Sequence, residues 1–126
     1  MNKVVFTEEA PAAIGPYSQA YQAKHTLYIS GQLGIDPVTG ELVEGVEAQC
    51  QQACENIGKI LAEAKMGFED VVKTTCFIAD MDDFAAFNEV YSKYFISKPA
   101  RSCVAVKQLP KNGLCEIETI AYKKKK

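Results

Sequence analysis

The chain has 126 residues, of which 48% are apolar and 24% are charged, a composition typical of one globular domain with its own core. It contains no apolar run as long as a membrane-spanning helix. The segment from Met1 to Glu9 turns acidic at once and lacks the apolar core of a signal peptide. We therefore expect one domain over residues 1–122 and a cytoplasmic location.

The last four residues, Lys123 to Lys126, are all lysines and change the charge balance. Without them, 10 basic residues stand against 16 acidic ones, a net charge of −6. A domain this acidic argues against nucleic acid as a partner. We expect residues 123–126 to be a solvated, disordered tail, with a weak RNA-attracting arm as the alternative.

The cysteine and histidine content predicts neither disulfides nor metal sites. Five cysteines are an odd number and include no CxxC pair, which favours buried, reduced thiols. A single histidine without a Cys/His cluster argues against a zinc or iron site. The chain has no Walker loop or GxGxxG turn, so we expect no nucleotide cofactor either.

Hydrophobic periodicity predicts the elements in chain order. A short edge strand is followed by an apolar, proline-containing loop and two further strands, at residues 3–6, 10–18, 18–23 and 26–31. Apolar residues at three- and four-residue spacing then predict a helix from Val46 to about Lys65. After a strand at 71–79, a second helix carries an apolar stripe from Phe84 to Phe95. Two more strands follow, at residues 99–106 and 115–122.

This order predicts an α+β fold with one sheet and both helices on one face. Two strand–helix–strand units in succession are typical of the split βαβ pattern. In such a two-layer fold, the second sheet face is bare unless another chain covers it. Threonines and cysteines rather than charges alternate on several strands, so we expect an oligomer that buries this face.

Arg101 stands near the start of the strand that Pro99 opens. Its planar guanidinium can bind a carboxylate or phosphate through two hydrogen bonds, although a structural ion pair is the alternative. Tyr17, in the apolar loop, offers an aromatic face and a hydroxyl, or else packs in the core. Gly31 allows a ligand or a second chain to approach the backbone closely. Asn88 is either a site residue or an exposed helix polar residue.

Several sequence blocks resemble the signature motifs of the RidA (YjgF/YER057c) family of imine deaminases. They lie in the family's order along nearly the whole chain: AAIGPYSQ (12–19), SGQ (30–32), VKTT (72–75), PARSCV (99–104), and LP (109–110) followed by EIE (116–118). The resemblance implies a chorismate-mutase-like protomer with a single mixed sheet. It also implies a homotrimer whose sheets face a central barrel and whose three clefts lie between subunits.

By the same resemblance, the clefts hydrolyse enamine and imine intermediates to 2-keto acids and ammonia. Such substrates include 2-aminoacrylate, 2-iminopropionate and 2-iminobutyrate. Pyridoxal-phosphate-dependent dehydratases release them, and their removal protects pyridoxal-phosphate enzymes. The family's motif positions fall on Tyr17, Ser30, Gly31, Asn88, Arg101, Cys103 and Glu116.

The chemistry of these residues fits the implied reaction. Arg101 can clamp the carboxylate of a 2-imino acid, and Glu116 can orient or deprotonate the attacking water. Backbone groups near Gly31 and Cys103 can hold the imine nitrogen and the water. Cys103 lacks a histidine base that would make it a nucleophile, so we expect Cys103→Ala to retain turnover and Arg101→Ala to lose it.

The remaining substrate contacts come from Tyr17, which would close the cleft against the substrate's flat π system, and from Ser30, which would hydrogen-bond near it. Two other functions stay open at the level of sequence. One is an endoribonuclease that acts on single-stranded RNA and inhibits translation. The other is a non-catalytic trimer that binds small molecules or acts like a chaperone.

Overall fold

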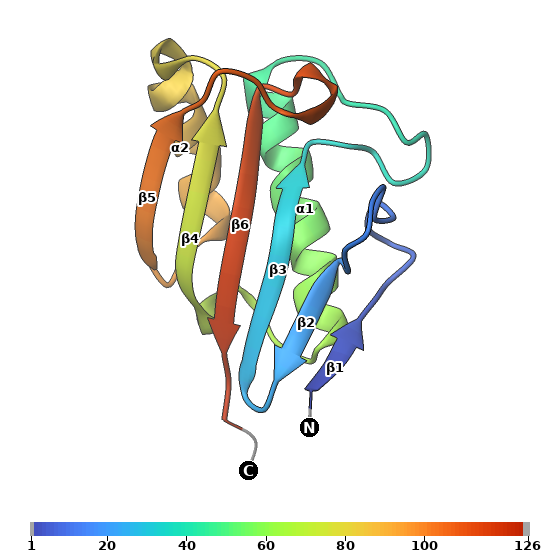
Figure 1. The fold of residues 1–126 in the computed structure, drawn as a ribbon. Helices are drawn as coiled ribbons and strands as arrows, with labels where there is room; N and C mark the ends of the chain where they lie inside the picture. Colours follow the sequence, from blue (N-terminus) through green and yellow to red (C-terminus); the bar gives the residue numbers. More distant parts are fainter. Residues whose placement is uncertain (1, 125–126) are drawn as a thin grey trace.

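The computed structural model describes residues 2–124 and contains one mixed sheet with two α-helices (Figure 1). The helices are α1 (Val46–Glu63) and α2 (Phe84–Tyr94). The strands are β1 (Asn2–Val5), β2 (Ala20–Ala23), β3 (Thr26–Leu33), β4 (Val71–Ile78), β5 (Ala100–Ala105) and β6 (Cys115–Tyr122). The α+β fold expected from the sequence is confirmed.

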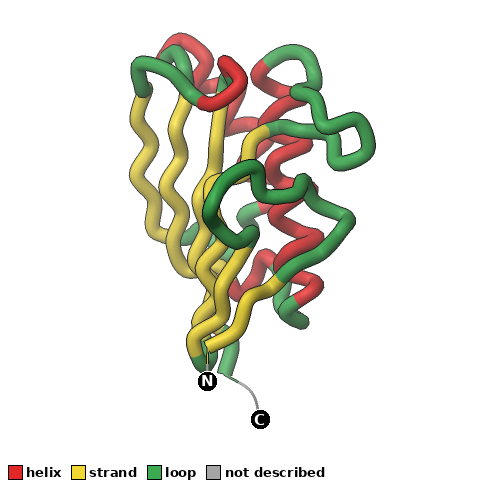
Figure 2. Tube along the Cα trace, turned by 45° about the vertical axis from the view of Figure 1, so that its right-hand side comes forward, coloured by secondary structure: helices red, strands yellow, loops and turns green. Residues whose placement is uncertain are grey.

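The strands are ordered β1-β2-β3-β6-β4-β5. Only β4 and β5 pair in parallel, and every other neighbouring pair is antiparallel. Strands β3 and β4 therefore run parallel with β6 between them, so β3–α1–β4 is a split βαβ unit. The β4–α2–β5 unit advances in the same direction along the sheet. Because such crossovers are right-handed, both helices lie on the same face, as Figure 2 shows.

The core lies between this sheet face and α1. Cys50, Ala53, Ile57, Ile60 and Leu61 recur at three- and four-residue spacing along α1 and are inaccessible to solvent. This is the apolar stripe that the sequence predicts. Burying it stabilises the fold by roughly 25 cal/mol for each Å² removed from water, and the helix ends within two residues of the expected position.

Neither α-helix covers the opposite face of the sheet (Figure 2). It carries apolar side chains that are each between 45 and 55% exposed: Val4, Tyr21, Tyr28, Val104 and Tyr122. The sequence predicted burial of this face because threonines and cysteines alternate on the strands. That reason was wrong, because these residues are buried on the helix side: Thr74, Cys76, Cys115 and Thr119. Aromatic and branched side chains, not small ones, make this face apolar.

All five cysteines are free thiols, and the expected burial is found for four of them but not for Cys103, which is half-buried. None of the described helices is both long and apolar enough to cross a membrane. In the lysine tail, the Lys123 amide donates a hydrogen bond to the His25 carbonyl at 3.0 Å. Lys125 and Lys126 lie outside the described residues.

Candidate active site

The loop between β1 and β2 is held in place by the buried side chain of Gln19. Its Oε1 accepts a hydrogen bond from the Thr7 amide at 2.8 Å, and its Nε2 donates to the carbonyls of Thr7 and Pro11 at 3.0 and 2.8 Å. These bonds satisfy backbone groups that an apolar loop cannot pair by itself. Gln19 was missed as an organising residue, because a single glutamine gives no periodic signal.

Tyr17 lies on this loop and is 50% exposed. The Ile14 amide donates a hydrogen bond to its hydroxyl at 3.4 Å, and the Tyr17 amide donates to the Gly15 carbonyl at 2.8 Å. The alternative of a core-packing tyrosine is therefore wrong. The aromatic ring is instead fixed against its own loop with one side open to solvent.

Strand β3 has an irregular register with β6 at Ser30 and Gly31, between the paired residues Ile29 and Gln32. A Cβ atom added at Gly31 would lie only 2.7 Å from Cδ of Glu116, so the absence of a side chain lets Glu116 fold over the β3 backbone. The Ser30 hydroxyl donates to the Ser18 carbonyl at 2.6 Å. Ser30 thus ties β3 to the segment that follows Tyr17.

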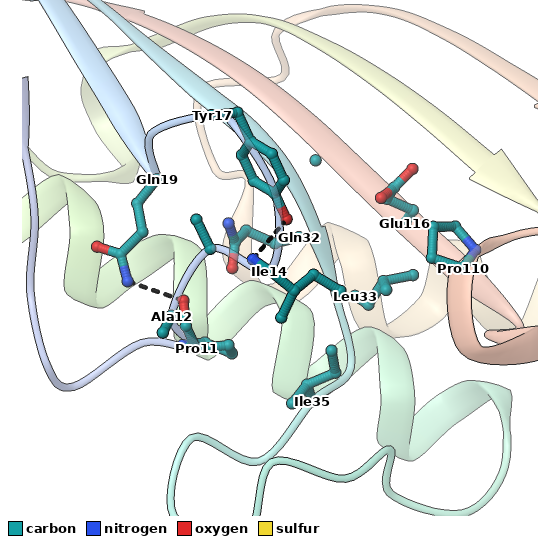
Figure 3. A pocket seen from close by; sticks show the side chains of 12 residues that line it. Pro11, Ala12, Ile14, Tyr17, Gln19, Gln32, Leu33, Ile35, Pro110 and Glu116 are labelled. Atoms are coloured by element: carbon teal, nitrogen blue, oxygen red, sulfur yellow. Dashed lines mark hydrogen bonds between the residues drawn. The ribbon is translucent and has the colours of Figure 1, made fainter.

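Glu116 lines a recess of about 70 Å³ together with Tyr17 and Gly31 (Figure 3). The rest of the wall is mostly apolar and includes Pro11, Ala12, Ile14, Leu33, Ile35 and Pro110. Burial raises the pKa of the Glu116 carboxyl, and the neighbouring charge of Glu118 raises it further. The recess therefore holds a carboxylate that takes up a proton more readily than an ordinary glutamate.

Arg101 lies elsewhere, on the helix-facing side of β5. Its Nη1 donates a 2.7 Å hydrogen bond to Oδ1 of Asn88 on α2, so Asn88 is not an unengaged helix polar residue. Arg101 and Asn88 both line a wider hollow of about 550 Å³ beside α2. No carboxylate among the described residues pairs with Arg101, since the one ion pair there joins Lys59 to Glu9. Within the described chain, Arg101 therefore forms no structural ion pair of the kind considered from the sequence.

The predicted site residues fall into two groups that do not meet within one chain. Tyr17, Ser30, Gly31 and Glu116 gather around β3 and β6. Strand β4 separates β6 from β5, where Arg101 pairs in register with the buried Thr74 on the helix side. Because Glu116 alternates with the buried Cys115 and Ile117, its side chain points to the other face.

Cys103 is two residues beyond Arg101 on the same face of β5 and pairs in register with Cys76. Burial raises the pKa of the Cys103 thiol, although the nearby Arg101 charge opposes this shift. The thiol therefore stays protonated and is a weak nucleophile. The single histidine, His25, packs against Tyr122 between β2 and β3 and is not a base for it.

Comparison with known proteins places the chain in a family. A family model described as Endoribonuclease L-PSP matches residues 7–123. A RutC family protein of Pyrococcus horikoshii is 54% identical, over 98% of this chain and 99% of its own length. The 2-iminobutanoate/2-iminopropanoate deaminase of Mus musculus is 52% identical, over 96% and 91%.

Solved structures agree with this match. A candidate endoribonuclease of Thermotoga maritima is 50% identical, with a TM-score of 0.95 over 99% of this chain and all of its own. TdcF of Escherichia coli, solved with bound serine, is 41% identical with a TM-score of 0.92, over 96% and 98%. The chain therefore belongs to the Endoribonuclease L-PSP family, which is the RidA family that its motifs resemble.

Proposed function

We propose that this protein hydrolyses reactive 2-imino acids and their enamine tautomers to 2-keto acids and ammonia. Relatives at about 50% identity that carry the name 2-iminobutanoate/2-iminopropanoate deaminase support this reaction. The substrates would be 2-aminoacrylate with its tautomer 2-iminopropionate, and 2-iminobutyrate. Their hydrolysis would protect pyridoxal-phosphate enzymes from attack by these intermediates.

The observation that carries this proposal is that Arg101 has no carboxylate partner among the described residues of the chain. Its guanidinium is a permanent cation that no described carboxylate neutralises, at the wall of a hollow that Tyr91 and Phe95 also line. A partly buried, unpaired charge is costly unless a ligand completes it. A 2-imino acid carries one fixed anion, its carboxylate, and a planar guanidinium binds a carboxylate through two parallel hydrogen bonds.

Glu116 would supply the proton transfers. Water adds to the carbon of the protonated imine while the Glu116 carboxylate takes the proton that the water loses. Glu116 then returns this proton to the nitrogen of the carbinolamine. The C–N bond breaks with its electron pair on nitrogen, the Glu116 carboxylate accepts the hydroxyl proton as the carbonyl forms, and the keto acid and ammonia leave. Tyr17, Ser30 and the Gly31 backbone would hold the substrate beside this carboxylate.

This reaction requires Arg101 and Glu116 on one substrate, so the proposal includes a homotrimer with a cleft between each pair of subunits. In a cyclic assembly, the Arg101 side of one protomer can meet the Glu116 side of the next. The exposed apolar side chains on the open sheet face supply a surface for such contacts. Each cleft would then be completed by two copies of the chain.

The test is imine hydrolysis measured with a chemical trap. An amino-acid oxidase generates 2-imino acids in place, and semicarbazide captures those that escape. We expect the wild type and the exposed-site control Lys107→Ala to suppress semicarbazone formation and Arg101→Ala to fail. Arg101→Lys keeps the positive charge but cannot form two parallel hydrogen bonds to a carboxylate. Its suppression of semicarbazone formation should therefore lie between those of the wild type and Arg101→Ala. Equal trapping with and without the wild-type protein would refute the proposal.

RNA cleavage is the second candidate, because the matched family description and the Thermotoga maritima relative both name an endoribonuclease. The net charge of −6 over residues 1–122 opposes it. Incubating single-stranded RNA with the same variants separates the two functions. Degradation that survives removal of residues 123–126 and disappears in Arg101→Ala would favour the nuclease.

A further inference from the structure

Arg101 is the only arginine in a chain that has 14 basic residues, and α2 surrounds it with neutral groups. The Arg101 Cζ atom lies 4.8 Å from the centroid of the Tyr91 ring and 5.6 Å from that of Phe84. Both distances are within the range of cation–π attraction. Phe84, Asn88 and Tyr91 follow at four- and three-residue spacing, so one face of α2 presents all three.

The hydroxyl of Tyr91 is also fixed by a hydrogen bond. It lies 2.6 Å from Oγ1 of Thr74, in a bond that is buried from solvent. Thr74 is fully buried on β4 and is the direct register partner of Arg101 in the parallel β4–β5 ladder. One tyrosine therefore links two neighbouring strands, with its hydroxyl on β4 and its ring against the arginine of β5.

We infer that Tyr91, tied to Thr74, is the positioning residue that fixes the plane of the Arg101 guanidinium for carboxylate binding. The identity of the bound carboxylate rests on the proposed function. Asn88 occupies Nη1, and no other hydrogen bond to the Arg101 side chain is found among the described residues. The Nε–Nη2 edge is thus left for the two oxygens of a substrate carboxylate.

The chemistry of Tyr91 suits this role because the ring stays neutral. Burial raises the pKa of Tyr91 to about 12, against the opposing effect of the Thr74 hydrogen bond. The phenol therefore orients the guanidinium without cancelling its charge. A carboxylate at the same place would hold Arg101 equally firmly, but it would compete with the substrate for the cation.

The matched control is Tyr94, three residues further along α2. Its ring packs against Phe68 at 5.8 Å between centroids, and its hydroxyl donates to Glu55 at 3.4 Å. Tyr94→Leu thus removes the same atoms from the same helix without touching Arg101. Tyr91→Phe is the conservative variant, since it keeps the ring and removes only the bond to Thr74.

The first readout is independent of activity. A single arginine gives a single side-chain Nε–Hε signal in nitrogen–proton spectra, which needs no assignment. We expect a rigid signal with a strong heteronuclear Overhauser effect in the wild type and in Tyr94→Leu, and a mobile signal in Tyr91→Leu. A rigid Arg101 in Tyr91→Leu would overturn the inference whether or not the protein hydrolyses imines.

The second readout is the split between KM and kcat. Loss of the ring face should raise KM for 2-iminobutyrate about tenfold in Tyr91→Leu, with kcat changed less than about threefold. Tyr91→Phe should stay within about threefold of the wild-type KM. A purely structural role predicts equal losses in Tyr91→Leu and Tyr94→Leu, and that result would contradict the inference. Failure of the wild type in the trapping assay would refute the proposed function alone.

Discussion

At the scale of single residues, the site depends on how closely Gly31 and Glu116 approach each other. A methyl group at Gly31 would meet Cδ, Oε2 and Cγ of Glu116 at 2.7, 2.8 and 3.0 Å. The strand irregularity at Ser30 and Gly31 and the position of the carboxylate are therefore one feature.

Gly31→Ala should displace Glu116 and lower kcat about tenfold or more, because the carboxylate would leave the position from which, in the proposed reaction, it activates water. It should cost at most about 1 kcal/mol of stability, because the atoms that the new methyl group meets belong to the end of a flexible side chain that can turn away. Denaturant unfolding and steady-state kinetics measure the two effects. Adding Glu116→Ala removes the clashing atoms, so the double variant should regain the stability without the activity. An unchanged Gly31→Ala enzyme would contradict this account.

The pH dependence of kcat/KM is also decided at this scale. As the proposed base, Glu116 must be deprotonated, so kcat/KM should fall as the pH drops through its pKa, which burial and Glu118 raise. Glu118→Gln removes the second cause and should move this acid limb to lower pH. Glu41→Gln, on an exposed loop, should leave the profile unchanged. A limb that stays in place in Glu118→Gln would argue against Glu116 as the base.

At the scale of elements, the loop before β2 presents Tyr17 because Gln19 pins it. Gln19→Ala removes the hydrogen bonds to Thr7 and Pro11 and should cost about 1–3 kcal/mol of stability. It should also raise KM, since the Tyr17 ring loses its support. Gln19→Glu keeps the acceptor for the Thr7 amide but loses the donors to the carbonyls. Its loss of stability should be nearly as large as that of Gln19→Ala. Amide exchange at Thr7 provides the local check, and unchanged protection in Gln19→Ala would contradict the pinning role.

The elements themselves could be predicted from the sequence because each has a local signal. The stripe of α1 and the spacing from Phe84 to Phe95 mark the helices, and both are found where they were expected. The motif residues could also be named individually. Their arrangement could not, because it depends on β6 entering between β3 and β4, a long-range pairing that no local pattern contains.

The same limit explains what was missed around Arg101. The alternation of side chains along the strand indicated which residues lie on the same face as Arg101. It could not show that α2 lays Asn88 and Tyr91 against the guanidinium, since the packing of a helix against a strand edge is decided by the tertiary fold. Similarly, the threonines on the strands could be read as lying on either sheet face until the helices were placed.

At the scale of the whole molecule, the open sheet face and the divided site lead to the same conclusion. Tyr28 and Val104 are about half exposed on the sheet face that neither α-helix covers. Arg101 and Glu116 lie on different strands and on opposite faces of the sheet. Assembly into a ring would bury the open sheet face and bring Arg101 of one subunit next to Glu116 of another.

The most direct test of this account is complementation between two inactive variants. Arg101→Ala and Glu116→Gln chains are unfolded together, refolded as a mixture and assayed by semicarbazide trapping. If clefts are shared in a trimer, random mixing should restore about a quarter of the wild-type activity, since each mixed ring contains one cleft with both native residues. The separately refolded variants should remain inactive. A mixture that is no more active than its components would contradict a shared cleft.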